Sequence, residues 1–429
     1  MSVDNVNLVN PKCVATTTDG LLETTTKAEP TPLRPSPRKH GSNFFREAHF
    51  SGDGTTIVTH NEDHSLKTFV LPPNLLDESE HAHPLQPYST YASPSVVRSY
   101  TIYPHYNLQD LSTTLILCAS ADVPISLRNA LQFDTVHASY QSINASTEQY
   151  ASTTALTFTR DGRHFIAGSH NRLDVFDCST DGSGPVLTHR TAAGKKASGL
   201  FNPLGASRKG LVSALSISGD GVLASGTMLR NVALYANEGS GECLTTFSLA
   251  TSPNRSDPAN GSGITHLKWS PCGTYLLIAE RQSEGVHVYD VRNMLRGVSR
   301  LSGRKANTTQ RLGIDVVPTA GGYEVWGGGT DGCVRMWSNP GQKEGMHAPD
   351  AEAQMHREPV SSAVWHPGGA VLATCSGQRT PYPAIDESEG SDGEEGSVIS
   401  DADSRVSETD KRSLPPIAKV DNTLKLWTI

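Results

Sequence analysis

The chain repeats one pattern seven times: a turn of small residues, a short apolar strand, a polar turn, and a strand that usually ends in an aromatic residue. Residues 161–177 and 220–235 are two clear copies of this pattern. The copies lie roughly 40–60 residues apart, a spacing typical of four-stranded sheets repeated around an axis. The sequence therefore predicts an all-β propeller, a closed scaffold whose functional residues lie in the loops at its two ends.

The copies divide residues 43–429 into seven expected blades of the WD40 type. The first strands of these blades are expected to begin near Ala48, Thr101, Ala155, Ser213, Ile264, Gly313 and Ser362. Blade two is the least regular, because its third strand, at residues 125–127, lacks the terminal aromatic residue. The 38 glycines and 26 prolines suit many short strands joined by turns and argue against a helical protein.

The last blade has only three strands of its own, since Trp427 ends a third strand and only Thr428 and Ile429 follow it. An unpaired strand edge is a liability, which closing the ring would remove. Residues 1–42 are polar and proline-rich, so most of them are expected to form a flexible tail. We expect residues 12–17 or 21–25 of this tail to supply the missing strand.

Ser36, followed by proline and two basic residues, is either a phosphorylation site or part of an unused linker.

Negative charge is concentrated in one segment. The net charge is −8, and residues 380–412 hold ten acidic and three basic residues, or −7 of that total. The remainder is close to neutral, so local patches of charge decide its partners. Residues 380–420 are expected to be a disordered acidic insert within blade seven, because this composition cannot form a core. The insert is either a solubilising loop or a competitor that screens a basic surface, strengthened by phosphorylation at Ser388 or Ser391.

Several classes of protein are excluded by what the sequence lacks. No apolar run approaches the ~18 residues that span a membrane, and the first residues have no basic start or apolar core of a secretory signal. The seven cysteines form no C-x-x-C pair, so they are expected to be packing residues in a reducing compartment, the cytosol or the nucleus.

Catalytic and metal-binding motifs are also missing. The glycines at 327–329 belong to a strand turn and lack the Gly-Lys-Ser/Thr of a phosphate loop. His81 and His83 lie in a proline-rich loop, which makes them poor metal ligands. We therefore expect no enzyme activity, no cofactor and no bound metal.

Beyond the repeats, several segments resemble the WD-repeat telomerase Cajal-body proteins and their fungal relatives. They include residues 43–45, 51–54, 71–73 and 101–103, the pair at 310–311, and above all residues 372–379, which precede Pro381, Pro383 and the acidic tract. The resemblance covers most of the chain from Asn43 onward. It implies a nuclear RNA-binding scaffold that recognises a short loop sequence in small Cajal-body RNAs and in telomerase RNA; one fungal relative is linked to pre-mRNA splicing.

The same resemblance implies partners and a location. The expected partners are a small nuclear or Cajal-body RNA and ribonucleoprotein proteins. Apart from the resemblance, we expect no membrane partner and expect the chain to be a monomer. The expected location is the nucleus, with a share in the cytoplasm left open.

Basic residues gather at one end of the predicted propeller, where the turns between second and third strands meet the connections between blades. Arginine binds phosphate through a planar fork and stacks on bases, and amide side chains read base edges. The candidate RNA-contacting residues are Arg172, Lys195, Lys196, Arg230, Arg281, Arg304, Lys305, Arg311, Gln378 and Arg379. The alternative is a protein-interaction scaffold that binds a peptide over the central channel and makes no direct contact with RNA.

Overall fold

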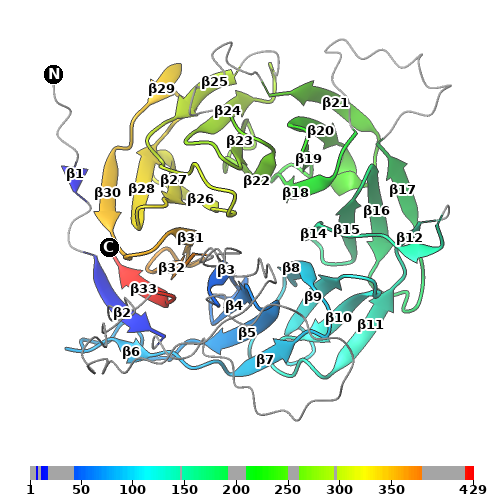
Figure 1. The fold of residues 1–429 in the computed structure, drawn as a ribbon, viewed down its shortest axis with the longest axis horizontal. Helices are drawn as coiled ribbons and strands as arrows, with labels where there is room; N and C mark the ends of the chain where they lie inside the picture. The colour runs from blue at the N-terminus through cyan, green and yellow to red at the C-terminus, as the bar shows by residue number, and fades with distance from the viewer. Residues whose placement is uncertain are drawn as a thin grey trace, which may run out of the picture.

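In the computed structural model, seven β-sheets are arranged as blades around a common axis (Figure 1). The structure describes residues 6–7, 11–17, 43–144, 147–191, 209–249, 260–293, 297–378 and 421–429. Within these ranges the regular structure is strand, apart from one short 3-10 turn at Asn237–Gly239. The predicted all-β, seven-bladed propeller is confirmed. The rest of the expected tail, the acidic insert and the candidate phosphorylation sites Ser36, Ser388 and Ser391 lie outside the described residues.

The first four blades each contain four antiparallel strands, with the first strand innermost. Blade one is β3 (Phe45–Phe50), β4 (Thr56–Asn61), β5 (Ser65–Val70) and β7 (Ser89–Ala92); blade two is β8 (Val97–Ile102), β9 (Leu115–Ser120), β10 (Ile125–Asn129) and β11 (Val136–Tyr140). Blade three is β14 (Ala155–Phe158), β15 (His164–Ser169), β16 (Arg172–Asp177) and β17 (Leu187–Arg190); blade four is β18 (Val212–Ile217), β19 (Leu223–Thr227), β20 (Asn231–Tyr235) and β21 (Cys243–Ser248). Between blades two and three, β12 (Ile143–Asn144) and β13 (Gln149–Tyr150) form a short hairpin.

Blades five to seven each carry a fifth strand, which pairs in parallel with the outer edge. Blade five is β22 (Ile264–Trp269), β23 (Tyr275–Glu280), β24 (Val286–Asp290), β25 (Gly297–Leu301) and β29 (Gly345–His347). Blade six is β26 (Ile314–Thr319), β27 (Gly322–Gly328), β28 (Cys333–Ser338), β30 (Ala351–Gln354) and β1 (Val6–Asn7). Blade seven is β31 (Val360–Trp365), β32 (Leu372–Ser376), β33 (Leu424–Thr428), β2 (Lys12–Thr16) and β6 (His83–Pro84).

The N-terminal strand β2 closes the ring. It pairs antiparallel with β33, the third strand of the last blade, so that Cys13 lies opposite Trp427. The predicted closure is therefore confirmed, with the first candidate segment supplying the strand; the second candidate, residues 21–25, lies outside the described residues. The outer edge of β2 is covered in turn by β6, which belongs to the long connection of blade one. Blades one and seven are thereby held together at the point where the ring closes.

The core is divided among the interfaces between neighbouring blades. Successive side chains of a strand point to opposite faces, so each blade offers one apolar face to the blade before it and one to the blade after it. Leu234 and Phe247 of blade four, for example, pack in one buried cluster with Leu267 and Leu276 of blade five. Packing of this kind fixes the blades relative to one another, and with them the loops at both ends of the ring.

Five of the seven innermost strands contain a shift of register at their second residue. The shifts fall at Arg46, Arg98, Ser213, Thr265 and Ser361, and each leaves one extra residue opposite the second strand. Such β-bulges turn a side chain away from its regular direction. In blades four and seven the bulged serine donates to a carbonyl of the next blade: Ser213 to Ile264, and Ser361 to Phe45. Blades one and two have arginine there instead.

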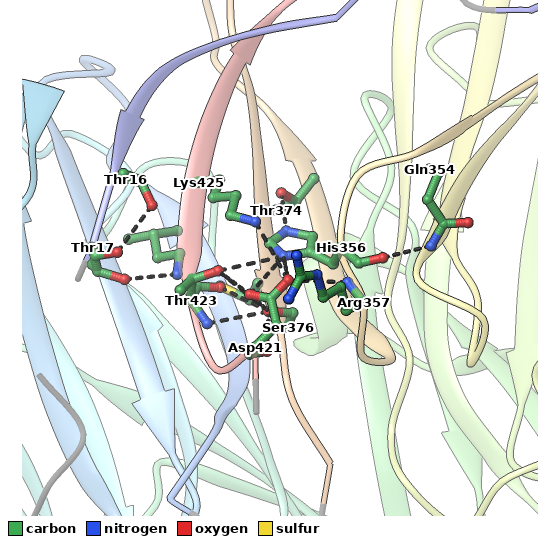
Figure 2. A network of polar contacts seen from close by, with 12 residues as sticks. Thr16, Thr17, Gln354, His356, Arg357, Thr374, Ser376, Asp421, Thr423 and Lys425 are labelled. Atoms are coloured by element: carbon green, nitrogen blue, oxygen red, sulfur yellow. Dashed lines mark hydrogen bonds and ion pairs between the residues drawn. The ribbon is translucent and has the colours of Figure 1, made fainter. Parts of the chain in front are cut away.

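A polar network joins the two strands that flank residues 379–420 (Figure 2). His356 lies 3.3 Å from a carboxylate oxygen of Asp421 through Nδ1 and 2.7 Å from the hydroxyl of Thr374 through Nε2. The indole of Trp427 donates to the same hydroxyl at 2.8 Å. Ser376 donates to the carbonyl of Asp421 at 2.6 Å. The strands on either side of the insert are therefore fixed to each other at the end of the propeller from which the insert leaves.

Candidate functional site

A cavity of about 740 Å³ lies at the end of the propeller where the innermost strands begin, which we call the top face. We call this cavity the mouth pocket. Its walls come from the beginnings of β3 and β8, from the turns after β4, β23, β27 and β32, and from the connection at residues 307–311. A second cavity of about 460 Å³, the central channel, lies within the ring of innermost strands. The lining residues common to both cavities are Glu47, Arg98, His266 and Arg311.

Four arginines line the mouth pocket: Arg46, Arg98, Arg281 and Arg311. Arg46 and Arg98 are the bulged residues of blades one and two, so the bulges carry their side chains to the mouth rather than into a blade interface. Arg46 lies 3.6 Å from a carboxylate oxygen of Glu62. The positive charge at this pocket therefore comes from opposite sides of the ring.

Arg281 and Arg311 are held in different ways. The Nη2 of Arg311 donates to the carbonyl oxygen of Thr265 at 2.7 Å, which anchors the guanidinium over blade five. Arg281 follows β23, and its Nε is buried without a hydrogen-bond partner among the described residues. Burial and the positive charges of Arg311 and Arg46 lower the pKa of Arg281. The guanidinium groups therefore repel one another, and an anion between them would relieve that repulsion.

Two carboxylates, Glu47 and Glu62, and two histidines, His60 and His266, also line the mouth pocket. Burial opposes the ionisation of Glu47, but the hydrogen bond from His49, at 3.1 Å, and the charges of His49 and Arg311 hold its pKa well below the usual range. His60 is 4% exposed, and burial together with the charge of Arg46 lowers its pKa to about 3. Burial and the charge of Arg311 likewise lower the pKa of His266. His60 and His266 are therefore neutral at physiological pH.

Of the residues predicted to contact RNA, Arg281, Arg311 and Gln378 line the mouth pocket. Gln378 directly precedes residue 379, so the insert leaves the described chain from the wall of this pocket. Gln310, beside Arg311, donates through its amide nitrogen to the carbonyl of Gly377 at 2.9 Å, which ties the blade connection to the same wall. Lys195, Lys196 and Arg379 lie outside the described residues.

Three other predicted contact residues lie outside the mouth pocket and are held by carboxylates. Arg172 donates through Nε to Asp174 at 2.6 Å. Arg230 binds the buried carboxylate of Glu280 with two nitrogens, at 2.6 and 2.9 Å. Lys305 lies 3.1 Å from a carboxylate oxygen of Asp331. An ion pair of this kind neutralises much of the charge that each residue would offer to a ligand.

Arg304 requires a correction. We predicted it as an RNA contact, but its side chain is fully buried, so it offers no surface to a ligand. Its Nη2 donates to the carbonyl oxygens of Leu312 and Gly313, the latter at 2.9 Å. Burial lowers its pKa to about 10, which still leaves it protonated at neutral pH. Arg304 therefore supports the backbone that carries Arg311 to the pocket, and it is not a contact residue.

Sequence reasoning missed Arg46, Arg98, Glu47 and His60. We expected the first strands of blades one and two to begin near Ala48 and Thr101, whereas β3 and β8 begin at Phe45 and Val97. Arg46 and Arg98 therefore looked like loop residues that precede a strand. The available signal was positional: both occupy the place that serine or threonine holds in blades four, five and seven.

Comparisons with known proteins identify several relatives of this chain. No family model matches the chain. Guanine nucleotide-binding protein negative regulator 1 of Schizosaccharomyces pombe is 34% identical over 314 residues, which cover 71% of this chain and 73% of that protein. Telomerase Cajal body protein 1 of Homo sapiens is 27% identical over 358 residues, covering 82% of this chain and 60% of that protein. Protein SWT21 of Vanderwaltozyma polyspora is 22% identical over 266 residues, covering 60% of this chain and 58% of that protein.

The chain belongs to the family of telomerase Cajal body protein 1 and its fungal relatives. It spans about three fifths of the length of the human relative. Three of the residues by which its sequence resembles the family, Gln310, Arg311 and Gln378, line the mouth pocket. The family resemblance and the top-face cavity therefore involve the same part of this propeller.

The described residues were also searched for metal-binding groups and for membrane-spanning helices. Among them, no group of three or more histidine, cysteine, aspartate or glutamate side chains is placed to bind a metal ion. The same part of the chain contains no helix with the length and apolar character needed to cross a membrane.

Acid should destabilise this family member in part through His60. Its pKa is near 3 in the folded chain and about 6.5 in the unfolded one, so the unfolded chain binds more protons once the pH falls below about 6.5. The stability contributed by the neutral imidazole is fully present above that pH and is lost progressively as the pH falls toward 3. At pH 5 the loss should be about 2 kcal/mol. In the His60→Asn variant, the free energy of unfolding in urea should change less between pH 7 and pH 5 than in the wild type. His81→Asn, at an exposed site, should leave this pH dependence unchanged. Equal pH slopes for wild type and His60→Asn would contradict this account.

Proposed function

We propose that this chain is a non-catalytic RNA-binding scaffold of a nuclear ribonucleoprotein, and that it holds RNA at the mouth pocket. The observation that carries this proposal is the set of four arginines around one top-face cavity, two of them placed there by β-bulges. A near-neutral propeller body that gathers guanidinium groups in this way offers a phosphate-binding surface. The proposed RNA is a small Cajal-body RNA, telomerase RNA or a splicing-related small nuclear RNA, with ribonucleoprotein proteins as further partners and the nucleus as the location.

The form of the cavity favours single-stranded RNA. A duplex presents a wide surface, whereas unstacked nucleotides can enter a pocket and be read along their edges. Amide groups suited to base edges lie beside the arginines, at Asn307, Gln310 and Gln378. We assign direct contacts to Arg46, Arg98, Arg281, Arg311 and Gln378. Lys195, Lys196 and Arg379 remain predictions, and we assign no direct contact to Arg172, Arg230 or Lys305, whose charges are largely offset by their carboxylate partners.

The acidic insert is connected to the same site at both of its ends. The described residue before it, Gln378, lies in the pocket wall, and the described residue after it, Asp421, lies in the network beside that wall. Its composition would let it compete with RNA for the arginines, more strongly if Ser388 or Ser391 were phosphorylated. This role for the insert remains a prediction.

The decisive test compares Arg281→Gln with Arg292→Gln. Both remove one positive charge from blade five, but Arg281 lines the mouth pocket, whereas Arg292 lies 2.7 Å from Asp290 on the turn after β24, at the opposite end. With single-stranded RNA of about 12 nucleotides, Arg281→Gln should weaken binding about tenfold, or about 1.4 kcal/mol. It should also reduce the slope of log affinity against log salt by about one unit. Arg292→Gln should behave as wild type; equal losses in both variants would contradict a top-face site.

A second candidate function is a protein-interaction scaffold without direct RNA binding. The observation in its favour is the Schizosaccharomyces pombe relative, whose name describes a negative regulator of a guanine nucleotide-binding protein. Salt-sensitive RNA binding that depends on Arg281 supports the first candidate. Absence of RNA binding at low salt, together with saturable binding of a guanine nucleotide-binding protein, would support the second.

A further inference from the structure

A third cavity, of about 480 Å³, lies between blades four and five, among the turns that follow β18, β22 and β24 at the end opposite the mouth pocket. We call it the outer groove. Its floor is apolar: Leu234 is 3% and Trp269 8% exposed, and Val222 and Val291 pack against the same cluster. Leu244, on the outermost strand β21, also lines the groove and is 52% exposed (Figure 1). A large exposed apolar side chain beside an apolar groove is typical of a binding surface.

Elsewhere in the ring, the connection between the third and fourth strands of a blade covers the interface with the preceding blade. In blade one, residues 71–88 place Leu75 in a buried cluster that includes Val371 of blade seven. In blade two, Phe133 stacks on Tyr91 of blade one, with 5.7 Å between the ring centroids. The fold itself therefore fills such interfaces with leucine or phenylalanine from a segment of chain.

The corresponding connection of blade five is short, because β24 ends at Asp290 and β25 begins at Gly297. In its described part, residues 291–293, the apolar side chain is Val291, which already belongs to the floor of the outer groove. Residues 294–296 lie outside the described residues. The outer groove therefore stands open at the kind of interface where blades one and two insert a leucine or a phenylalanine.

The charge at the rim of the outer groove is negative. Arg292 donates to Asp290 through Nε at 3.0 Å and through Nη2 at 2.7 Å, so its positive charge is largely neutralised. Asp220, on the turn after β18, is exposed and has no ion-pair partner within the described part of the chain. A cationic group of a ligand would complement this carboxylate.

We propose that the outer groove binds an extended segment of another protein, in which a leucine or phenylalanine lies two positions from a lysine or arginine. Alternate side chains of an extended segment share one face, so both would point into the groove. The apolar side chain packs against Leu244 and Trp269, and the cation lies beside Asp220. Burial of apolar surface supplies the affinity, and the charge selects the sequence. This surface is separate from the mouth pocket, so the inference does not depend on RNA binding.

The test selects binders of the full chain from a displayed library of random peptides of about 12 residues. The recovered peptides should share an apolar residue two positions from lysine or arginine, and a synthetic copy of one of them is the probe. Leu244→Asp should weaken its binding at least about tenfold. Asp220→Asn should weaken it about threefold and make it less sensitive to salt. Leu229→Asp is the matched control and should bind as wild type, since Leu229 is 62% exposed on the turn after β19, at the opposite end.

Cys272 provides an independent readout, because its exposed side chain lines the outer groove. A saturating concentration of the peptide should slow alkylation of Cys272 by iodoacetamide about fivefold or more. The other six cysteines are buried or partly buried, so the reaction at Cys272 can be followed separately by mass spectrometry.

Three results would overturn the inference: recovered peptides without the shared pair of residues, equal binding by wild type and Leu244→Asp, or alkylation of Cys272 that the peptide does not slow. Binding lost in Arg98→Gln but kept in Leu244→Asp would also overturn it, because the peptide would then occupy the mouth pocket. If Leu244→Asp fails to fold, as judged by thermal unfolding, Cys272→Trp replaces it, because tryptophan at this exposed position would fill the groove. RNA binding by Leu244→Asp should equal that of wild type, so failure of the inference leaves the proposed function intact.

Discussion

Removing residues 1–17 should lower the free energy of unfolding by more than about 4 kcal/mol, because it opens the ring. The strand β2 pairs with β33 over its length, and Thr17 adds a backbone hydrogen bond of 2.9 Å to the carbonyl of Leu424. Ala15 is fully buried in the cluster that joins blades seven and one. Without β2, β6 loses its partner and the outer edge of β33 is left unpaired, so strand edges are exposed to other molecules. The melting temperature should fall by about 10 °C or more.

Deleting residues 1–10 is the matched control for this truncation. It removes β1, whose register with β30 involves only Val6 and Asn7, and it leaves β2 in place. The loss should then be about 1 kcal/mol or less. A peptide of residues 6–17 added in excess should restore part of the stability of the shorter chain. An unchanged melting temperature after deletion of residues 1–17 would contradict closure of the ring by this segment.

Ring closure could be predicted from the sequence because it follows from counting strands. Trp427 ends a third strand, and a blade needs a fourth, so an upstream segment had to supply it. The fifth strands could not be predicted in this way. β6 and β29 each precede the fourth strand of one blade and pair with the edge of the preceding blade. Such pairing depends on the path of a long connection in space, which local patterns do not reveal.

The candidate site was predictable in its location but only partly in its residues. Arg281 and Gln378 follow second strands, so the repeat alone places them at the top face. Arg230 occupies the equivalent position in blade four, yet Glu280 of the next blade binds it, a contact between residues far apart in the sequence. The repeat also gives no sign that Arg304 is buried, since burial depends on how the connection packs. Position within a repeat therefore predicts which end a residue occupies, but it does not predict whether its charge is available.

Replacing Asp421 by alanine should cost about 3 kcal/mol, because it breaks a buried network at the edge of the acidic insert (Figure 2). The carboxylate accepts from Thr423 at 2.5 Å and from the backbone of Arg357 at 3.0 Å, and it faces Nδ1 of His356. Burial opposes its ionisation, but the hydrogen bond and charge of His356 and the hydrogen bond from Thr423 hold its pKa well below the usual range. Its stabilising effect is therefore present above about pH 4 and is lost as the pH falls further.

Asp63→Ala is the matched control, since Asp63 occupies the corresponding turn of blade one but is exposed. Asp63 accepts from the backbone and hydroxyl of Ser65, at 2.9 and 2.6 Å, so its loss should cost about 1 kcal/mol or less. Urea unfolding followed by tryptophan fluorescence measures both variants, because Trp427 shares Thr374 with the network. Asp421→Ala should also show a weaker loss of stability between pH 4 and 3 than wild type. A cost no greater than that of Asp63→Ala would mean that the network does not fix the strands beside the insert. The geometry of the mouth-pocket wall at Gln378 would then depend on β32 and on the hydrogen bond from Gln310 to Gly377.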